Sequence, residues 1–251
     1  MINVLDHGYV KFIECWGSDE RVIEAARMST DKGFNGWGPI HESSCHSLHE
    51  PTFPCTCTPK AGDEKLLAFL YKNKHMTPFE MGGIVIEVMA PIFVFREWHR
   101  HRTQSYNEMS ARYIPLPNVN YVPSIDRILN GIASVGTNRQ AAALNAKGDP
   151  IEEPDFENWL GDLESAYKYS QVVYERGLKL GVPKELARLP VPVARYSRMR
   201  ASANLRNWLQ FLTLRQAPNA QWEIRQYAEA VGILVSESFP RTYALFKGEP
   251  K

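Results

Sequence analysis

Two kinds of hydrophobic pattern follow one another along this chain, and their order limits the folds that it can adopt. Runs rich in β-branched residues come early, whereas apolar residues at helical spacing dominate the later part. Early strands followed by later helices favour an α+β fold over repeated βαβ units, with an antiparallel or mixed sheet and packed helices. The sequence predicts strands at residues 2–5, 9–15 and 83–89, and helices at residues 18–28, 64–73, 92–102, 155–180, 205–212 and 220–239.

The chain is expected to form a single domain over residues 1–251. This length is enough for one large hydrophobic core, and no repeat or linker divides the sequence. Residues 33–63 interrupt the helix and strand patterns with four prolines, three cysteines and three histidines. Because glycine and proline at this density break regular structure, we expect an inserted loop within the domain.

The cysteines and histidines of this insertion allow two interpretations. Both side chains are common zinc ligands. However, a single residue separates Cys55 from Cys57, whereas zinc sites usually have a gap of two or more, and no second pair follows. We therefore expect a surface loop with free thiols and no metal, and metal analysis of the purified protein would decide between the two. The residues concerned are His41, Cys45, His46, His49, Cys55 and Cys57.

The composition, 44% hydrophobic and 23% charged, is ordinary for a globular protein. No segment resembles a signal peptide or a membrane span, so we expect a cytoplasmic protein that does not bind membranes. The net charge of +1 argues against a nucleic-acid polymer as partner. Residues 184–215 nevertheless hold seven basic residues and one acidic residue, and residues 96–112 hold four and two. Such local concentration suggests a small anionic ligand, such as a phosphate.

The densest polar cluster lies at residues 100–112. Its arginines, Arg100, Arg102 and Arg112, supply forked donors that suit phosphate and carbonyl oxygens. Burying so many polar groups without a partner would be costly, so a ligand-binding site explains the cluster well. The alternative is a solvated helix end followed by a polar loop.

A second cluster consists of Asn204, Arg206, Gln210 and Arg215 along one predicted helix. With about 3.6 residues per turn, Arg206 and Gln210 share one flank of a leucine stripe, and Asn204 and Arg215 share the other. One helix could therefore present two polar edges to two ligands or to two subunits. The alternative is a half-buried surface helix with ordinary charged flanks.

The motif Arg100-His101-Arg102, followed by seven residues and then Ser110, resembles the signature of the flavin-dependent thymidylate synthases. The resemblance covers nearly the whole chain apart from about residues 33–63 and 131–153. It implies an enzyme with bound FAD, assembled as a homotetramer in which several subunits build each active site. Further blocks that resemble the family in the same order lie at residues 25–29, 75–80, 90–94, 185–188, 204–206, 214–215 and 220–224.

By the same resemblance, the enzyme would be a methyltransferase that converts dUMP to dTMP by reductive methylation. Methylenetetrahydrofolate would donate the carbon, and FAD reduced by NADPH would donate the hydride. Arg215 would be catalytic, because its guanidinium would stabilise negative charge at N3 and O4 of uracil. FAD would contact Ser29, Thr77, Arg100, His101, Arg102, Glu108, Asn204, Leu205, Arg206 and Gln210. The substrate dUMP would contact Glu97, Trp98, His99, Arg100, Glu108, Met109, Ser110, Ala111, Arg112, Arg188 and Arg215.

Two positions depart from the family pattern. Glu97 stands where glutamine is usual, and Gln210 stands where asparagine is usual. A carboxylate near a phosphate is repulsive unless an arginine such as Arg96 or Arg100 offsets it, which puts a direct contact between Glu97 and dUMP in question. Gln210 keeps the amide with one more methylene, so we expect a shifted flavin contact.

Two other functions fit parts of this pattern. A nucleic-acid-binding module would use the arginines with aromatic residues such as Trp98 and Tyr106, and it would bind polymers in a salt-dependent manner. A flavin oxidoreductase without methyl transfer would oxidise NADPH without dUMP. An absorption spectrum followed by an assay for dTMP would separate the three functions.

Overall fold

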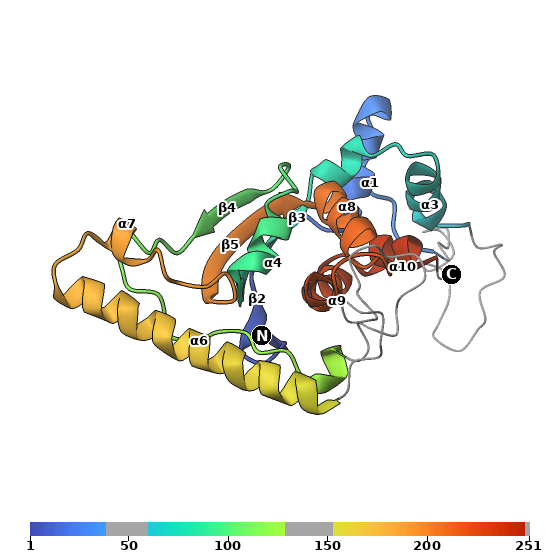
Figure 1. Ribbon diagram of the computed structural model, residues 1–251. Helices are drawn as coiled ribbons and strands as arrows, with labels where there is room; N and C mark the ends of the chain where they lie inside the picture. The colour runs from blue at the N-terminus through green and yellow to red at the C-terminus, as the bar shows by residue number, and fades with distance from the viewer. Residues whose placement is uncertain (39–59, 129–152, 249–251) are drawn as a thin grey trace, which may run out of the picture.

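A five-stranded sheet forms the centre of the computed structural model, which describes residues 1–38, 60–128 and 153–248 (Figure 1). Every neighbouring pair of its strands is antiparallel. The prediction of an α+β fold with helices packed on a sheet is therefore confirmed. Across the sheet, the strands lie in the order β1 (Ile2–Val4), β2 (Gly8–Trp16), β3 (Gly83–Pro91), β5 (Tyr196–Asn204) and β4 (Ser105–Glu108).

The sequence analysis does not predict β4 and β5, although β5 lies inside the sheet and pairs with β3 over all nine of its residues. Side chains alternate along β5, with Met199 buried between the exposed Arg198 and Arg200. Because of its arginines, this segment resembles a basic loop. However, alternation of exposed and buried side chains with a period of two is typical of a half-buried strand.

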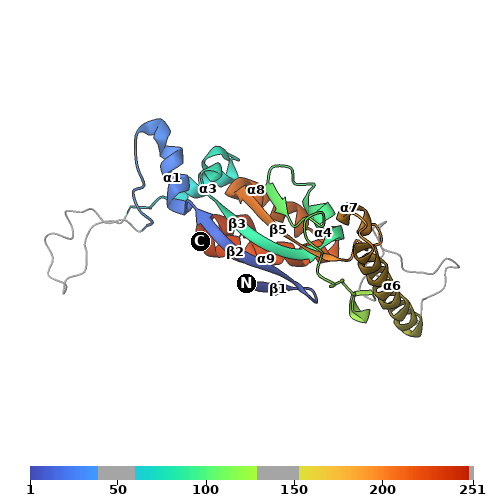
Figure 2. The same ribbon diagram turned by 90° about the vertical axis from the view of Figure 1, so that its left-hand side faces the viewer.

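Helices cover one face of the sheet and extend beyond it (Figures 1 and 2). α8 (Leu205–Arg215) packs on β3 and β5, and α9 (Trp222–Ser238) packs on β1 and β2. α10 (Pro240–Lys247) packs on α9 and on α3 (Glu64–Lys72). The other short elements are α1 (Asp19–Arg27), the 3₁₀ helices η1 (Met28–Thr30) and η2 (Thr77–Glu80), and α4 (Ile92–Trp98).

The observed ends of the helices match the ends predicted from the sequence only in part. Ser18 caps α1 as predicted, since its side chain accepts a hydrogen bond from the backbone N–H of Arg21 at 3.4 Å. The helix predicted at residues 92–102 already ends at Trp98, because the chain turns there into β4. α10 is not predicted; it begins at Pro240, whose ring suits the first position of a helix.

A long helix, α6 (Glu153–Lys179), lies along one side of the sheet, with α7 (Lys184–Ala187) beyond its C-terminal end (Figure 1). It begins two residues before the expected cap, Asp155. Gln171 of α6 accepts a hydrogen bond from Arg195 at 2.8 Å, which attaches the helix to the residue just before β5.

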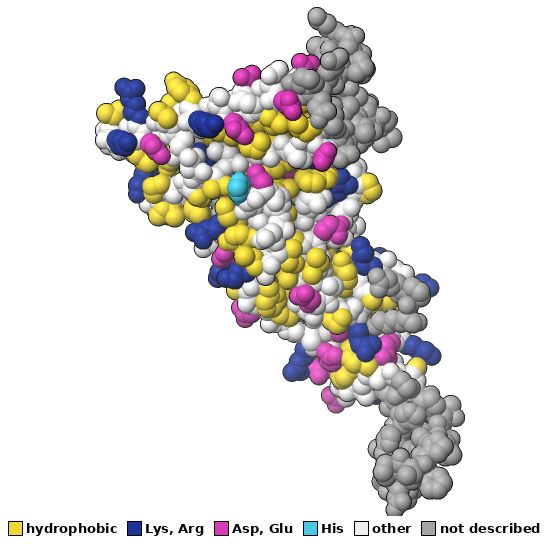
Figure 3. Space-filling model, turned by 90° about the horizontal axis from the view of Figure 1, so that it is seen from below, with side chains coloured by type: hydrophobic (Ala, Val, Ile, Leu, Met, Phe, Trp, Pro, Cys, Tyr) yellow, Lys and Arg dark blue, Asp and Glu magenta, His cyan; other side chains and the backbone are white. Residues whose placement is uncertain are grey.

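Hydrophobic and charged side chains are mixed over the face of the molecule in Figure 3. No helix in the described parts of the chain has the length and apolar character needed to cross a membrane.

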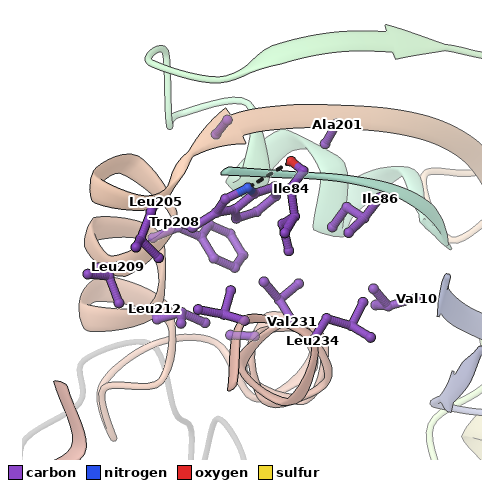
Figure 4. Packing of buried hydrophobic residues seen from close by; sticks show 14 of the residues in the cluster. Val10, Ile84, Ile86, Ala201, Leu205, Trp208, Leu209, Leu212, Val231 and Leu234 are labelled. Atoms are coloured by element: carbon purple, nitrogen blue, oxygen red, sulfur yellow. Dashed lines mark hydrogen bonds between the residues drawn. The ribbon is translucent and has the colours of Figure 1, made fainter. Parts of the chain in front are cut away.

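The hydrophobic core lies between the sheet and helices α8 and α9 (Figure 4). Leu205, Leu209 and Leu212 form the stripe that the sequence predicts for α8, and all three are buried. The Trp208 indole donates a hydrogen bond to the carbonyl oxygen of Ile84 at 3.0 Å and so attaches α8 to β3. Burial of each large apolar side chain contributes about 1.5–3 kcal/mol to the free energy of unfolding. The packing of α8 therefore fixes the positions of the polar residues at its ends.

The six cysteine and histidine residues considered as zinc ligands lie outside the described residues. Two hydrogen bonds join the two ends of the insertion that carries them. Asp63 N donates to the Gly36 carbonyl at 3.0 Å, and Gly38 N donates to the Glu64 carboxylate at 2.8 Å. Among the described residues, no cluster of three or more His, Cys, Asp or Glu side chains could hold a metal ion.

Candidate functional site

The turn after α4 carries the first arginine cluster. The Trp98 indole is buried beneath this turn, donates to Gln104 Oε1 at 3.0 Å, and stacks on Phe211 of α8 with 4.6 Å between ring centroids. Arg100 and Arg102 are exposed on the other side of the turn. The buried tryptophan thus fixes the turn against α8 and leaves its arginines accessible.

Arg215, the last residue of α8, reaches back to the same turn. Its Nε donates to His101 Nε2, its Nη1 donates to Glu97 Oε2, and its Nη2 donates to the Glu97 carbonyl oxygen, each at 2.8 Å. The sequence analysis names Arg96 and Arg100 as examples of arginines that could offset the Glu97 carboxylate; in the structure, Arg215 pairs with it. Three hydrogen bonds fix the orientation of the planar guanidinium, which suits it to recognise a planar ligand.

The His101 ring is neutral in this arrangement. Its burial, and next to that the adjacent Arg215 cation, lower the pKa of His101 from 6.5 to about 4. The Glu97 carboxylate acts in the opposite direction but is the smallest influence. Arg215 is therefore held by one anionic residue and one neutral ring.

The first turn of α8 contacts the same segment. Asn204 caps the helix by accepting a hydrogen bond from Asn207 N at 2.9 Å, and the Asn207 side chain donates to the Thr103 carbonyl at 3.0 Å. Arg206 forms an ion pair with Glu80 of η2. The two arginine-rich stretches, distant along the chain, therefore converge in space.

The groups around this turn suit the phosphates of a flavin dinucleotide. Within the described residues, Arg100 and Arg102 form no ion pair, so their forked donors are available to a diphosphate. Thr77 belongs to η2, which packs on α8, and Gln210 is exposed one turn after Arg206. The residues present therefore fit the group that the resemblance implies.

Ser29 lies in η1, directly after α1, and is exposed. Its hydroxyl donates to the Ala26 carbonyl at 3.2 Å. α1 packs on η2, which contains Thr77, and η1 with Ser29 follows α1 directly.

A second group of predicted ligand residues lies beyond the other end of β4, beside α7. Arg112 Nε lies 3.5 Å from Glu185 Oε2, and Lys184 Nζ donates to the Tyr113 carbonyl at 2.7 Å. Arg188 directly follows α7 and is exposed. Ion pair and hydrogen bond together join the loop after β4 to α7, so that Arg112 and Arg188 belong to one region.

These two groups are separate within one chain. Among the described residues, no hydrogen bond or ion pair joins Arg112 or Arg188 to Arg215. α7 and α8 lie well apart in both views (Figures 1 and 2). Glu108 and Met109, at the end of β4, are half-buried. The structure thus brings Arg215 together with the predicted flavin residues, but it leaves part of the predicted nucleotide site at a distance.

Three of the expected ligand residues are buried in the single chain. Trp98 and Leu205 are 0% exposed, and Ala111 is 4% exposed. The backbone N–H of Leu205 is also used, because it donates to the Gly82 carbonyl at 2.7 Å. Trp98 and Leu205 belong to the hydrophobic core, as their apolar character favours.

His99 is half-buried as well. Its ring lies 4.9 Å from that of Tyr106, and its Nε2 lies 3.3 Å from the Met199 sulfur. Through these contacts, the His99 ring packs the end of α4 against β4 and β5.

A hollow of about 530 Å³ on the sheet contains charged residues that the sequence analysis does not assign to a site. Arg198 and Arg200 of β5 line it together with Glu87 of β3, and Arg200 donates to Glu87 at 3.1 Å. The alternation of charged and apolar residues along β5 is the signal that could have placed these arginines side by side on one face.

The chain is similar to known proteins over nearly its whole length. The model of the family described as thymidylate synthase complementing protein matches residues 11–241. A flavin-dependent thymidylate synthase from Thermosipho melanesiensis is 33% identical over 243 residues, which cover 97% of this chain and 92% of the relative. Another from Thermus thermophilus is 34% identical over 246 residues, which cover 98% of this chain and 78% of the relative. The crystal structure of the UMP/dUMP methylase PolB from Streptomyces cacaoi, bound with 5-Br dUMP, matches with a TM-score of 0.73 and 28% identity over 98% of this chain and 97% of that chain.

Proposed function

This chain belongs to the family of flavin-dependent thymidylate synthases, and on that basis we propose that it methylates dUMP to dTMP. Methylenetetrahydrofolate is the proposed carbon donor, and FAD reduced by NADPH is the proposed hydride source. The observation that carries the proposal is the fixed Arg215 guanidinium beside the arginine-rich turn. The solved PolB structure holds 5-Br dUMP, which supports a uracil nucleotide as substrate.

Arg215 is the proposed catalytic residue. We place its guanidinium against the N3 and O4 atoms of uracil, where it stabilises the negative charge that develops as C5 becomes nucleophilic. An arginine has five N–H donors, and three of those of Arg215 are used by His101 and Glu97. A donor that is held in place before the reaction lowers the barrier by about 3–4 kcal/mol.

Bound FAD would supply the hydride that completes the methyl group. Arg100 and Arg102 are the proposed phosphate ligands, because both are exposed cations on a turn that the core fixes. Arg206, which forms an ion pair with Glu80, is a further proposed contact of the same ligand. Further proposed flavin contacts are Ser29, Thr77, His101, Glu108, Asn204 and Gln210.

The nucleotide phosphate is proposed to bind the group beside α7. Arg112 and Arg188 supply cations there, and Ser110 supplies a hydroxyl. Because this group lies apart from Arg215 of the same chain, we propose a homotetramer in which neighbouring subunits complete each active site. Size measurement in solution tests the assembly.

Purified protein supplied with FAD, NADPH, methylenetetrahydrofolate and dUMP should form dTMP and release tritium from dUMP labelled at C5. Its absorption spectrum should be that of a flavoprotein. A colourless protein that does not take up FAD would overturn the proposal. Oxidation of NADPH without dUMP-dependent dTMP formation would favour a flavin oxidoreductase, and salt-dependent binding of polymers without FAD would favour a nucleic-acid-binding module. The cytoplasmic location stays a prediction.

A further inference from the structure

The Glu97 carboxylate is the outermost partner of Arg215. The Glu97 side chain is 43% exposed, whereas the Arg215 side chain is 15% exposed. The carboxylate is therefore the more solvent-accessible member of this pair, whose Nη1–Oε2 distance is 2.8 Å.

The position of Arg215 does not depend on that carboxylate alone. Nε is held by the buried His101 ring, and Nη2 is held by the Glu97 backbone carbonyl, both at 2.8 Å. These two acceptors would remain if the carboxylate turned away or lost its charge. The carboxylate thus adds charge neutralisation and occupies one N–H, while the other two bonds supply the orientation.

A charged acceptor on the guanidinium opposes two things that a uracil nucleotide needs. It uses an N–H donor that could bind the base, and it weakens the attraction of the cation for a further electron-rich oxygen. It also places a half-exposed negative charge beside Arg215, which an anionic nucleotide would have to approach.

We propose that Glu97 is an internal competitor for the nucleotide base at Arg215, and that binding of the nucleotide displaces its carboxylate. This inference rests on the proposed function, and it assigns Glu97 a role in setting substrate affinity instead of a direct contact with the phosphate. It makes Glu97 a residue that weakens ground-state binding, while His101 and the Glu97 carbonyl position the arginine.

The test compares Glu97→Gln and Glu97→Ala with the unaltered protein, all loaded with flavin. Calorimetry measures the Kd of dUMP and of deoxyuridine, which has the base without the phosphate. Loss of the charge should lower both Kd values about tenfold or more, the range expected when a hydrogen bond to a charged group no longer has to be broken. KM for dUMP should fall with it. Glu24→Gln is the matched control, because Glu24 pairs with Arg21 on the surface of α1, and it should change neither value.

Unchanged or weaker binding in both Glu97 variants would overturn the inference, and a fall in kcat with a rise in KM would show that the carboxylate positions Arg215. A gain for dUMP without a gain for deoxyuridine would also overturn it, because phosphate repulsion alone would then explain the effect. Flavin content and the thermal midpoint identify a variant that has not folded, and the other variant then gives the result. If the unaltered protein methylates dUMP, a negative result removes this inference alone; if it binds neither FAD nor dUMP, the proposed function fails as well.

Discussion

The Arg215 guanidinium donates a hydrogen bond from Nε to Nε2 of the His101 ring, and the same ring packs edge-on against Phe211 at 4.9 Å between centroids. Nε2 is therefore an acceptor, and the ring is neutral with its proton on Nδ1. Protonation of Nε2 would place two cations in contact at a site where little water can screen them. The position of Arg215 is thus linked to the protonation state of His101.

Acid should destabilise the protein through His101. Its pKa is lower in the folded chain, at about 4, than its ordinary value of 6.5, so protonation favours unfolding. The stabilisation is complete above about pH 6.5 and is lost as the pH falls toward about 4. Urea unfolding across this range should show a smaller pH dependence for His101→Gln, which keeps an acceptor but does not titrate. His7→Gln, at an exposed histidine, should keep the pH dependence of the unaltered protein. Equal slopes for His101→Gln and the unaltered protein would contradict this.

Replacement of Arg215 should abolish methylation and leave FAD bound. Arg215→Ala removes the donor proposed to stabilise the charge on uracil, which should lower kcat about 10²–10³-fold. Arg215→Lys should be almost as inactive, since an ammonium group cannot reproduce a planar fork held by His101 and Glu97. Tritium release measures the reaction and flavin absorbance measures the cofactor. Arg21→Ala, at an exposed arginine of α1, is the control and should stay active. Normal turnover by Arg215→Ala would remove Arg215 from the mechanism.

Trp98 should matter for stability and not for ligand contact. Trp98→Phe removes the hydrogen bond to Gln104 and part of the stack on Phe211. The free energy of unfolding should fall by about 1–3 kcal/mol, as expected for a lost buried hydrogen bond and a small cavity. The Kd of dUMP, measured where the variant is fully folded, should be unchanged. A large loss of dUMP affinity with normal stability would instead support the nucleotide contact that the family resemblance suggests.

Several elements of the fold could be predicted from the local sequence pattern alone. The early strands follow from β-branched runs, and α8 follows from leucine spacing. β4 could not be predicted in this way, because its four residues, Ser105–Glu108, include no β-branched side chain. It becomes a strand because β5 supplies pairing partners for it, which is a tertiary effect that overrides local propensity.

The candidate site, too, could be predicted from the sequence only in part. The convergence of two arginine-rich stretches could be expected, because both carry residues that suit one anionic ligand. The pairing of Glu97 with Arg215 could not, since 118 residues separate them and the nearby Arg96 and Arg100 offered simpler partners. Only the path of the chain through β4, β5 and α8 brings this carboxylate to that guanidinium.

Asp19 should be among the most important polar residues for stability, because it holds the helix that the sequence analysis missed. Its carboxylate is buried and accepts hydrogen bonds from Arg241 N at 2.8 Å, Thr242 N at 3.2 Å and Thr242 Oγ1 at 2.6 Å. It therefore caps α10 from α1, more than two hundred residues earlier in the chain. Asp19→Ala leaves these donors without a partner, so urea unfolding should show a loss of about 2–3 kcal/mol. Ser18→Ala, which removes a partly exposed cap of α1, should cost about 0.5–1 kcal/mol and serves as the matched control. Equal losses in the two variants would mean that α10 is held by its apolar contacts alone.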